Sequence, residues 1–452
     1  MQTTTTAEAP ERLLSFGLLQ PRYAAHELLA ALRETGAREA AELLFRHKIS
    51  SMAKATAERL AADADDEDRA LLAELAERVV ERASVMRDRW RSAPAVGELV
   101  AGFAAQEGIE WWTMKGFSFR PLYPEGAIRD VGDLDVLVRT MDDAWRLARR
   151  LREDGYIYLD IELPWFKRDI RTQELYGQIR LTTPNRDRLS IDIHAGPYSI
   201  RHCALMPLSR TEAGLGTPAG PVAFEDDVCA VVANAAGDFF ITAKMINDLL
   251  LALGRELDVA YIHRTLDAGG LLPFFATCLG RLDAWCALTG EQAERAAELT
   301  PDVVPEPVPS VVRPDAAVRC EVTVAHARAT AERLFPEDPA EVEAVVASAR
   351  EAYSADHPLR AVPDEQATAI DWDGLNNWAC VRLVPAELAG TVLPAAGGAP
   401  SAPDDVSAVA GTDEATRSGS GTNSVVHAIG DVFVPTVDFA LPASVGGVLA
   451  AS

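Results

Sequence analysis

The stretch RDVGDLDVLV, residues 129–138, holds the pattern from which the architecture and the chemistry of this chain are inferred. From residue 131 it alternates and then becomes fully apolar, which predicts a strand over 131–138 that enters a core. Asp133 and Asp135 are two positions apart, so strand alternation turns both carboxylates to one face. Close like charges repel unless a cation lies between them, and Mg²⁺ prefers hard oxygen ligands. A solvated strand edge is the alternative, because Asp-x-Asp is common in an acidic chain.

The surrounding sequence predicts an α+β fold. β-Branched and aromatic residues predict strands, and a stretch rich in Leu, Ala and Arg predicts a helix that ends at Gly155. The predicted order is strand 109–114, a short helix after Lys115-Gly116, strand 131–138, helix 141–154, and strands 178–182 and 189–194 joined by a turn at Pro184-Asn185. This order indicates a sheet with helices on one side.

Residues 190–194, Ser-Ile-Asp-Ile-His, supply a third acid on a predicted neighbouring strand. Asp192 and His194 share one face of that strand. Three acids on one sheet face suit a two-metal phosphoryl transfer. Asp133 and Asp135 would hold the metal that binds the triphosphate. Asp192 would help to hold the metal that lowers the pKa of the attacking hydroxyl, or would take its proton. For His194, orienting Asp192, contacting substrate and a purely structural role stay open.

Lys115-Gly116 lies between a predicted strand and a predicted helix, upstream of the acids. A glycine there lets a phosphate approach the backbone, and a helix start offers N–H donors. Ser118 adds a hydroxyl and Lys115 a positive charge, so these residues are candidates for nucleotide binding. An ordinary turn is the alternative.

Two further basic residues are candidates for contacts to the nucleotide. Arg129 can clamp a phosphate bidentately, or pair with Asp130 or Asp133 as part of the structure. Lys244 is four residues before Asp248 on a predicted helix, where a surface ion pair is the default and a contact to the nucleotide the alternative.

Composition excludes several classes of protein. The net charge is −25, which disfavours a nucleic-acid partner because duplex binding needs a basic surface. The first ten residues lack the features of a secretory signal, and no apolar run is long enough to span a membrane. The six cysteines are scattered with no Cys-x-x-Cys, which argues against a zinc knuckle or a disulfide scaffold and favours a cytoplasmic protein.

The chain is predicted to contain several regions, since its length suits two or three domains. They are an N-terminal helical region (1–105), a catalytic core (106–222), a helical region completing the nucleotide cleft (223–300), a Pro-rich linker (301–316), a C-terminal helical region (317–388) and a mostly disordered tail (389–452).

Taken together, the motifs resemble the DNA-polymerase-β-like nucleotidyltransferase superfamily, and more closely its branch of uncharacterised bacterial nucleotidyltransferases. In that branch Lys-Gly precedes the Asp-x-Asp strand and the third acid lies in an Asp-x-His strand. The motifs in this chain are Lys-Gly at 115–116, Leu-Tyr-Pro at 122–124, Arg-Asp at 129–130, Gly-Asp-Leu-Asp-Val-Leu-Val at 132–138 and Asp-Ile-His at 192–194. The later segment 224–253 is similar to the helical part of that branch. The resemblance covers roughly residues 20–290.

The resemblance implies that Asp133, Asp135 and Asp192 bind metal and that Gly116 and Ser118 form the phosphate-binding turn. It also implies an enzyme that moves a nucleoside monophosphate from a nucleoside triphosphate, with ATP as the expected donor, to a small molecule or peptide. Mg²⁺ is the implied cofactor and pyrophosphate the second product. Two alternatives are a protein-modifying (AMPylating) transferase of the toxin or antitoxin kind, and a non-catalytic nucleotide-binding protein. The presence of all three acids argues against the last.

Overall fold

The computed structural model describes residues 9–158, 164–169, 175–184, 188–196, 219–309, 311–353, 381–385 and 433–437. The chain forms two compact units, each built from three segments. The first unit comprises residues 1–95, 114–134 and 222–314, and the second comprises 96–113, 135–221 and 315–452. The predicted disordered tail (389–452) lies outside the described residues except for 433–437, and Asn185 of the predicted turn lies outside them too.

The first unit is helical, as the spacing of its apolar residues predicts. Its elements are α1 (Ala9–Leu13), η1 (Leu14–Gly17), α2 (Ala25–Thr35), α3 (Ala37–Arg46), α4 (Ser50–Ala61), the first part of α5 (Asp66–Glu107), α6 (Gly116–Phe119), η2 (Arg120–Leu122), α8 (Phe224–Asp238), α9 (Ala243–Ala252), α10 (Val259–Ala268), α11 (Leu272–Trp285) and α12 (Gly290–Leu299). Its largest fully buried side chains are Phe16, Phe119, Phe274, Phe275 and Trp285.

Helix α5 continues through a proline. Pro94 lacks the N–H that would bond the carbonyl of Trp90 four residues earlier, and such a proline normally kinks or ends a helix. Arg120 compensates, because its guanidinium donates to the Trp90 carbonyl and lies over the Trp90 ring, 4.3 Å from the ring centroid. The freed acceptor is therefore satisfied from outside the helix.

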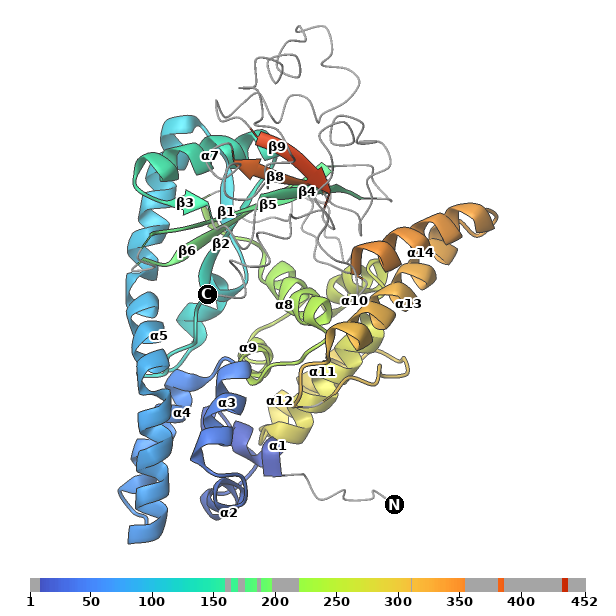
Figure 1. The fold of residues 1–452 in the computed structure, drawn as a ribbon. Coiled ribbons are helices and arrows are strands. Elements are labelled where there is room, and N and C mark those ends of the chain that lie inside the picture. Colours follow the sequence, from blue (N-terminus) through green and yellow to red (C-terminus); the bar gives the residue numbers. More distant parts are fainter. Residues whose placement is uncertain are drawn as a thin grey trace, which may run out of the picture. The chain divides into compact units, whose positions relative to one another are not determined.

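The second unit contains a mixed β-sheet with nine described strands (Figure 1). They are β1 (Trp111–Thr113), β2 (Asp133–Val138, which starts in the first unit), β3 (Ile157–Tyr158), β4 (Trp165–Arg168), β5 (Leu175–Thr182), β6 (Ser190–Ala195), β7 (Gly220–Pro221), β8 (Val381–Pro385) and β9 (Phe433–Val437). The order is β7-β1-β2-β6-β5-β4-β8-β9, with β3 paired to β5. β1 is antiparallel to β2 and parallel to β7, and β5 is antiparallel to β6. The α+β expectation is confirmed.

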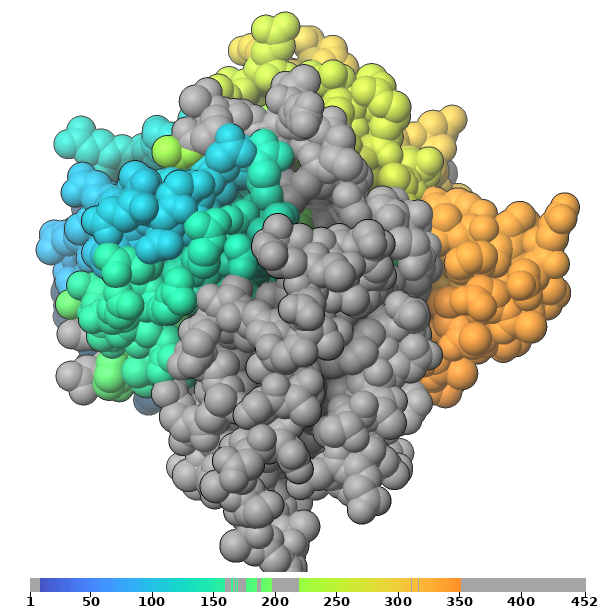
Figure 2. Space-filling model, turned by 90° about the horizontal axis from the view of Figure 1, so that it is seen from above, coloured from blue at the N-terminus to red at the C-terminus, as the bar shows by residue number. Residues whose placement is uncertain are grey.

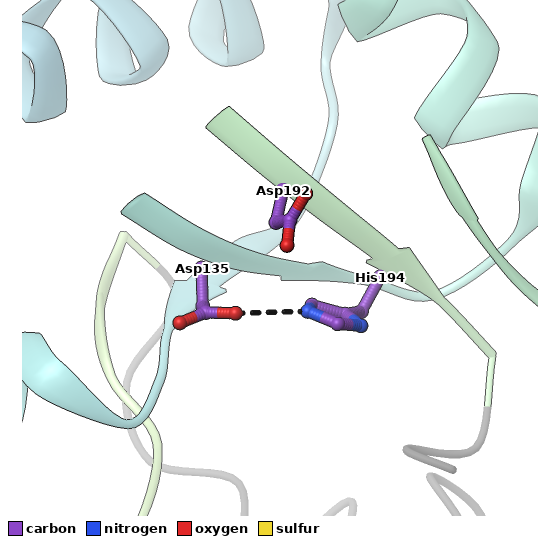
Figure 3. A group of neighbouring side chains, drawn as sticks. All are labelled: Asp135, Asp192 and His194. Carbon is purple, nitrogen blue, oxygen red and sulfur yellow. Dashed lines mark hydrogen bonds and ion pairs between the residues drawn. The ribbon is translucent and has the colours of Figure 1, made fainter. Parts of the chain in front are cut away.

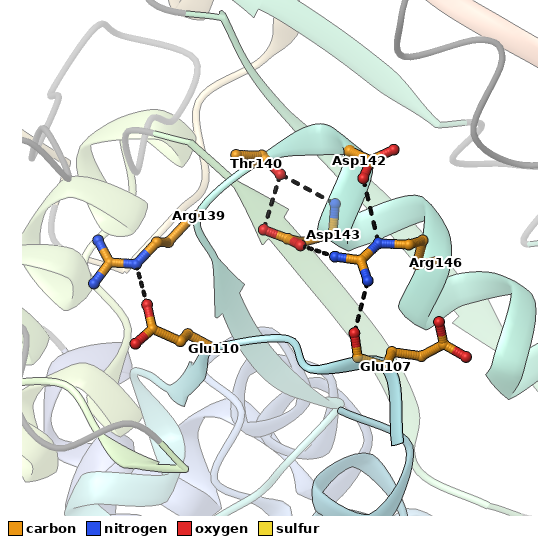
Figure 4. Close-up of polar contacts among 7 residues, drawn as sticks. All are labelled: Glu107, Glu110, Arg139, Thr140, Asp142, Asp143 and Arg146. Carbon is orange, nitrogen blue, oxygen red and sulfur yellow. Dashed lines mark hydrogen bonds and ion pairs between the residues drawn. The ribbon is translucent and has the colours of Figure 1, made fainter. Parts of the chain in front are cut away.

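Helix α7 (Met141–Glu153) packs on β5 and β6 and is fixed at its start by polar contacts (Figure 4). Thr140 caps it by accepting from the Asp143 N–H at 3.1 Å. Arg146 pairs with two acids in the first turn and donates to the Glu107 carbonyl at 2.7 Å, which ties α7 to the end of α5. Gly155 follows the helix with φ of +95°, a conformation that glycine adopts readily, so the predicted helix end is confirmed.

The predicted C-terminal helical region (317–388) contains two helices, α13 (Ala316–Leu334) and α14 (Pro339–Tyr353), but its described end, Val381–Pro385, is the strand β8. Their exposed face is orange in Figure 2. They share a small core made by Cys320, Val324, Ala327, Ala331, Val342, Val345, Val346 and Ala349. Of the predicted tail, only β9 is described, and it pairs with β8. Among the described residues, no helix is long and apolar enough to cross a membrane.

Candidate functional site

Strands β2 and β6 bring two of the predicted acids together with a histidine (Figure 3). The side chains of Asp135, Asp192 and His194 are buried, and each offers one ligand atom such that all three atoms lie within 4.8 Å of one another. His194 Nε2 lies 3.0 Å from Asp135 Oδ1. The strands are neighbours in the sheet, and alternation along β6 turns Asp192 and His194 to the same face. Two carboxylates and an imidazole at this spacing fit a divalent cation.

Arg180 contributes a positive charge to this group. It is the cross-strand partner of Asp192 on β5, and its Nε lies 3.5 Å from Asp192 Oδ1. An opposite charge at this distance favours the ionised form of a carboxyl group. Sequence reasoning missed Arg180, because the register between β5 and β6 depends on a turn that the sequence does not define.

Asp133 is the first residue of β2 and is half-buried, whereas Asp135 is buried. Asp133 is not part of the group formed by Asp135, Asp192 and His194. It acts electrostatically on Lys244, since its charge raises the pKa of that lysine. Both acids lie on the strand β2, two positions apart.

The Lys115-Gly116 turn lies in the first unit and leads into α6, as predicted. The backbone N–H of Lys115 donates to the carboxylate of Asp227, a buried residue of α8. A Cβ at position 116 would lie 2.5 Å from Arg129 Nη1, so the glycine gives room to that guanidinium. Ser118 is buried in α6, and its Oγ has no hydrogen-bond partner in the described part of the chain. Phosphate binding by this turn stays a prediction.

Arg129 makes a buried, bidentate ion pair with Asp248 of α9. Its Nε donates to Oδ1 and its Nη2 to Oδ2, both at 2.8 Å. Tyr123 donates its hydroxyl to Asp248 Oδ1 at 2.9 Å, and burial together with the Asp248 charge raises the pKa of the Tyr123 phenol well above its usual range. Asp248 therefore does not form a surface ion pair with Lys244, and that expectation is wrong. The neighbouring Asp130 instead accepts from the backbone N–H groups of Ser50 and Ser51 at 2.9 and 3.2 Å.

Lys244 is half-buried in the first turn of α9. Burial lowers its pKa to about 7, and the charges of Arg129 and Lys48 act in the same direction. The charges of Asp248 and Asp133 oppose the shift without cancelling it. Lys48 is a second residue that sequence reasoning missed, since it lies far from every recognised motif.

A family model described as an uncharacterised nucleotidyltransferase matches residues 33–287, which is more than half of the chain. No curated protein and no solved structure matches it. The matched range includes the buried group of Asp135, Asp192 and His194 as well as the Lys115-Gly116 turn. The chain therefore belongs to the uncharacterised nucleotidyltransferase family.

Proposed function

We propose that this protein transfers a nucleoside monophosphate from a nucleoside triphosphate, preferably ATP, to an oxygen of a small-molecule or peptide acceptor. The acceptor oxygen forms a bond to the α-phosphorus, the bond from the α-phosphorus to the α–β bridging oxygen breaks, and its electron pair leaves with pyrophosphate. The observation that carries the proposal is the buried group of Asp135, Asp192 and His194 in a chain of a nucleotidyltransferase family.

The acids have separate roles in this proposal. Asp133 and Asp135 would hold Mg²⁺ together with the triphosphate, and Asp192 would help to hold a second ion or accept the proton of the attacking hydroxyl. When bound, Mg²⁺ neutralises phosphate charge and lowers the pKa of that hydroxyl. His194 lies 3.0 Å from Asp135, which fits a role in orienting that carboxylate.

The basic residues would bind the triphosphate. Lys115, Gly116 and Ser118 are proposed as the turn that approaches the phosphates. Lys244 is proposed to contact a phosphate directly. Arg129 is already held by Asp248 through two hydrogen bonds, so its proposed contribution is the field of a fixed positive charge beside Gly116.

Nucleotide labelled at either the α- or the γ-phosphate tests the reaction. We expect α-label, and no γ-label, to move from ATP to an acceptor in a host extract with Mg²⁺. Asp135→Asn and Asp192→Asn should lower the rate on the order of 10²–10³-fold, because a charge-stabilising group is lost from the transition state. Asp142→Asn is the matched control, since Asp142 is an exposed acid on α7 paired with Arg146.

The same experiment separates the possible acceptors. Label in a small molecule or peptide supports the proposal, and label only on a protein band identifies the protein-modifying alternative. Transfer of the γ-label would show phosphoryl transfer instead. If the Asp133→Ala, Asp135→Ala double variant binds Mg²⁺-ATP as tightly as the parent protein, the assignment of these two acids as metal ligands is wrong.

A further inference from the structure

Lysine is rare in this chain. There are five lysines among the 43 basic residues, so arginine supplies nearly all of the positive charge. Many ion pairs between described residues are made by arginine, for example Arg129 with Asp248 and Arg328 with Glu343, whereas Lys54 pairs with Glu58. A lysine is a compact point charge rather than a planar fork, and it is suited to phosphate contacts that need no fixed geometry. Lys48 and Lys244, two of the five lysines, are brought together in the fold and are therefore candidates for such contacts.

Lys48 occupies a backbone position that normally belongs to glycine. It follows the end of α3 with φ of 57°, and the turn is closed by hydrogen bonds from the Lys48 N–H to the Phe45 carbonyl (3.1 Å) and from the Ile49 N–H to the Leu44 carbonyl (3.2 Å). Residues with a Cβ are disfavoured at such a position, where glycine is the usual choice. A lysine in this backbone conformation is less favourable than a glycine would be, which points to a use for its side chain.

Lys48 is held beside Lys244 by one backbone and one side-chain contact of the adjacent residue His47. The His47 carbonyl accepts from the Lys244 N–H at 3.2 Å, and His47 Nδ1 accepts from the Ala243 N–H at 3.1 Å. The next N–H of α9, that of Met245, is bound by the side chain of Thr242. The N–H groups of Ala243, Lys244 and Met245 thus already form hydrogen bonds within the protein. An anion at this end of α9 would therefore be bound by the ammonium groups of the two lysines.

The positive charges of the two lysines are only partly compensated by the nearby acids Asp248 and Asp133. Lys48 is exposed and Lys244 half-buried, and neither ammonium group forms an ion pair or a side-chain hydrogen bond with the residues that the structure describes. Asp248, a buried acid four residues after Lys244, is bound to Arg129. Burial is the main cause that lowers the pKa of Lys244, and the charges of Arg129 and Lys48 add to it. The two lysines therefore raise the electrostatic free energy of one another. An anion that offsets both charges needs several charged oxygens spread over its length, which is the chemistry of a polyphosphate.

We propose that Lys48 and Lys244 together bind the polyphosphate of the nucleotide, and that Lys48 is a further binding residue of this protein. This inference rests on the proposed function, and it adds a subsite on the turn after α3. The pair would supply two donors for phosphate oxygens in addition to those of the Lys115-Gly116 turn.

Calorimetric titration of the full chain with inorganic tripolyphosphate and pyrophosphate, in EDTA and without nucleotide, tests the subsite. We expect Lys48→Gly and Lys244→Met each to weaken tripolyphosphate binding by about 10-fold or more, because each removes charge-assisted hydrogen bonds. Lys54→Gln is the matched control, since Lys54 lies on the adjacent helix α4 but is paired with Glu58. It should bind as the parent protein does.

Thermal unfolding separates a binding role from a structural one. Glycine fits the backbone at position 48, and methionine removes a partly buried charge at position 244, so neither variant should lower the melting temperature. Unchanged tripolyphosphate affinity in both variants, or no binding by the parent protein, overturns the proposal. Asp135→Asn should keep full tripolyphosphate affinity in EDTA. Suppose that Asp135→Asn abolishes nucleotide transfer while Lys48→Gly and Lys244→Met bind tripolyphosphate as the parent protein does. That result would refute the lysine subsite but would still support the proposed function.

Discussion

Asp248 is the residue on which the polar interior of the first unit depends. It accepts hydrogen bonds from the guanidinium of Arg129 and from the hydroxyl of Tyr123, and all three side chains are buried. Removing one partner of a buried ion pair leaves the other charge without compensation, which is far worse than losing an exposed pair. The matched exposed pair is Arg328 with Glu343, which is also bidentate, at 2.7 and 2.9 Å.

We predict that Asp248→Ala lowers the free energy of unfolding by about 3–5 kcal/mol. Glu343→Ala should lower it far less, because water screens the exposed pair. Urea denaturation of both variants measures the difference. Equal losses would mean that Asp248 is not the compensating charge for Arg129.

At the scale of single residues, alternation explains what the sequence could predict. Asp192 and His194 were placed on one face because two positions separate them, and the structure brings both to Asp135. The partner of Arg129 could not be found this way, since Asp248 lies 119 residues further along the chain. The same holds for Arg180, whose contact with Asp192 depends on strand register.

Among the elements, α3 and α9 are joined by a buried histidine. His47 Nδ1 accepts from Ala243 on α9, so Nε2 carries the proton and donates to the Val311 carbonyl at 3.2 Å. Burial lowers the pKa of His47 from 6.5 to about 4. The folded protein thus prefers the neutral imidazole, whereas the unfolded chain takes up a proton below about pH 6.5.

We predict that the burial of neutral His47 lowers the free energy of unfolding in acid. The stabilisation is fully present above pH 6.5 and is lost as the pH falls towards 4. At about pH 5 the loss in the free energy of unfolding is about 2 kcal/mol. Comparing urea unfolding at about pH 7.5 and about pH 5 measures the loss. His47→Gln does not titrate, so its unfolding free energy should change with pH by about 2 kcal/mol less than that of the parent protein. Identical pH dependence in the two proteins would contradict the buried neutral imidazole.

Helices and strands could be predicted where the periodic spacing of apolar residues extends over many positions. The helix predicted at 141–154 is α7, and the strands predicted at 131–138 and 189–194 are β2 and β6. The short strands β3, β4, β7, β8 and β9 were not predicted, because a strand of two to five residues is defined by its distant partner more than by its own sequence. Helix α5 passes Pro94 because Arg120 satisfies the freed carbonyl, which no local pattern reveals.

For the whole molecule, composition and motif order gave the class correctly, and the family match confirms the nucleotidyltransferase assignment. Composition and motifs could not identify the acceptor, because an acceptor is recognised by side chains outside the motifs. The net charge does favour some classes of acceptor over others. With 68 acidic against 43 basic residues, the chain repels polyanions at long range, while a small nucleotide needs only a local group of cations.

We therefore predict that the protein binds Mg²⁺-ATP but not a duplex nucleic acid. Nonspecific duplex binding releases counterions from phosphates that basic side chains neutralise, and it reaches dissociation constants of about 10⁻⁴–10⁻⁶ M in proteins with a suitable basic surface. Fluorescence anisotropy with a short labelled duplex of DNA or RNA, at physiological and at low salt, measures this directly. We expect no binding tighter than about 10⁻⁴ M at physiological salt. Tight binding that weakens steeply with added salt would reveal a basic groove despite the net charge of −25, and it would make a nucleic acid the leading acceptor in place of a small molecule or peptide.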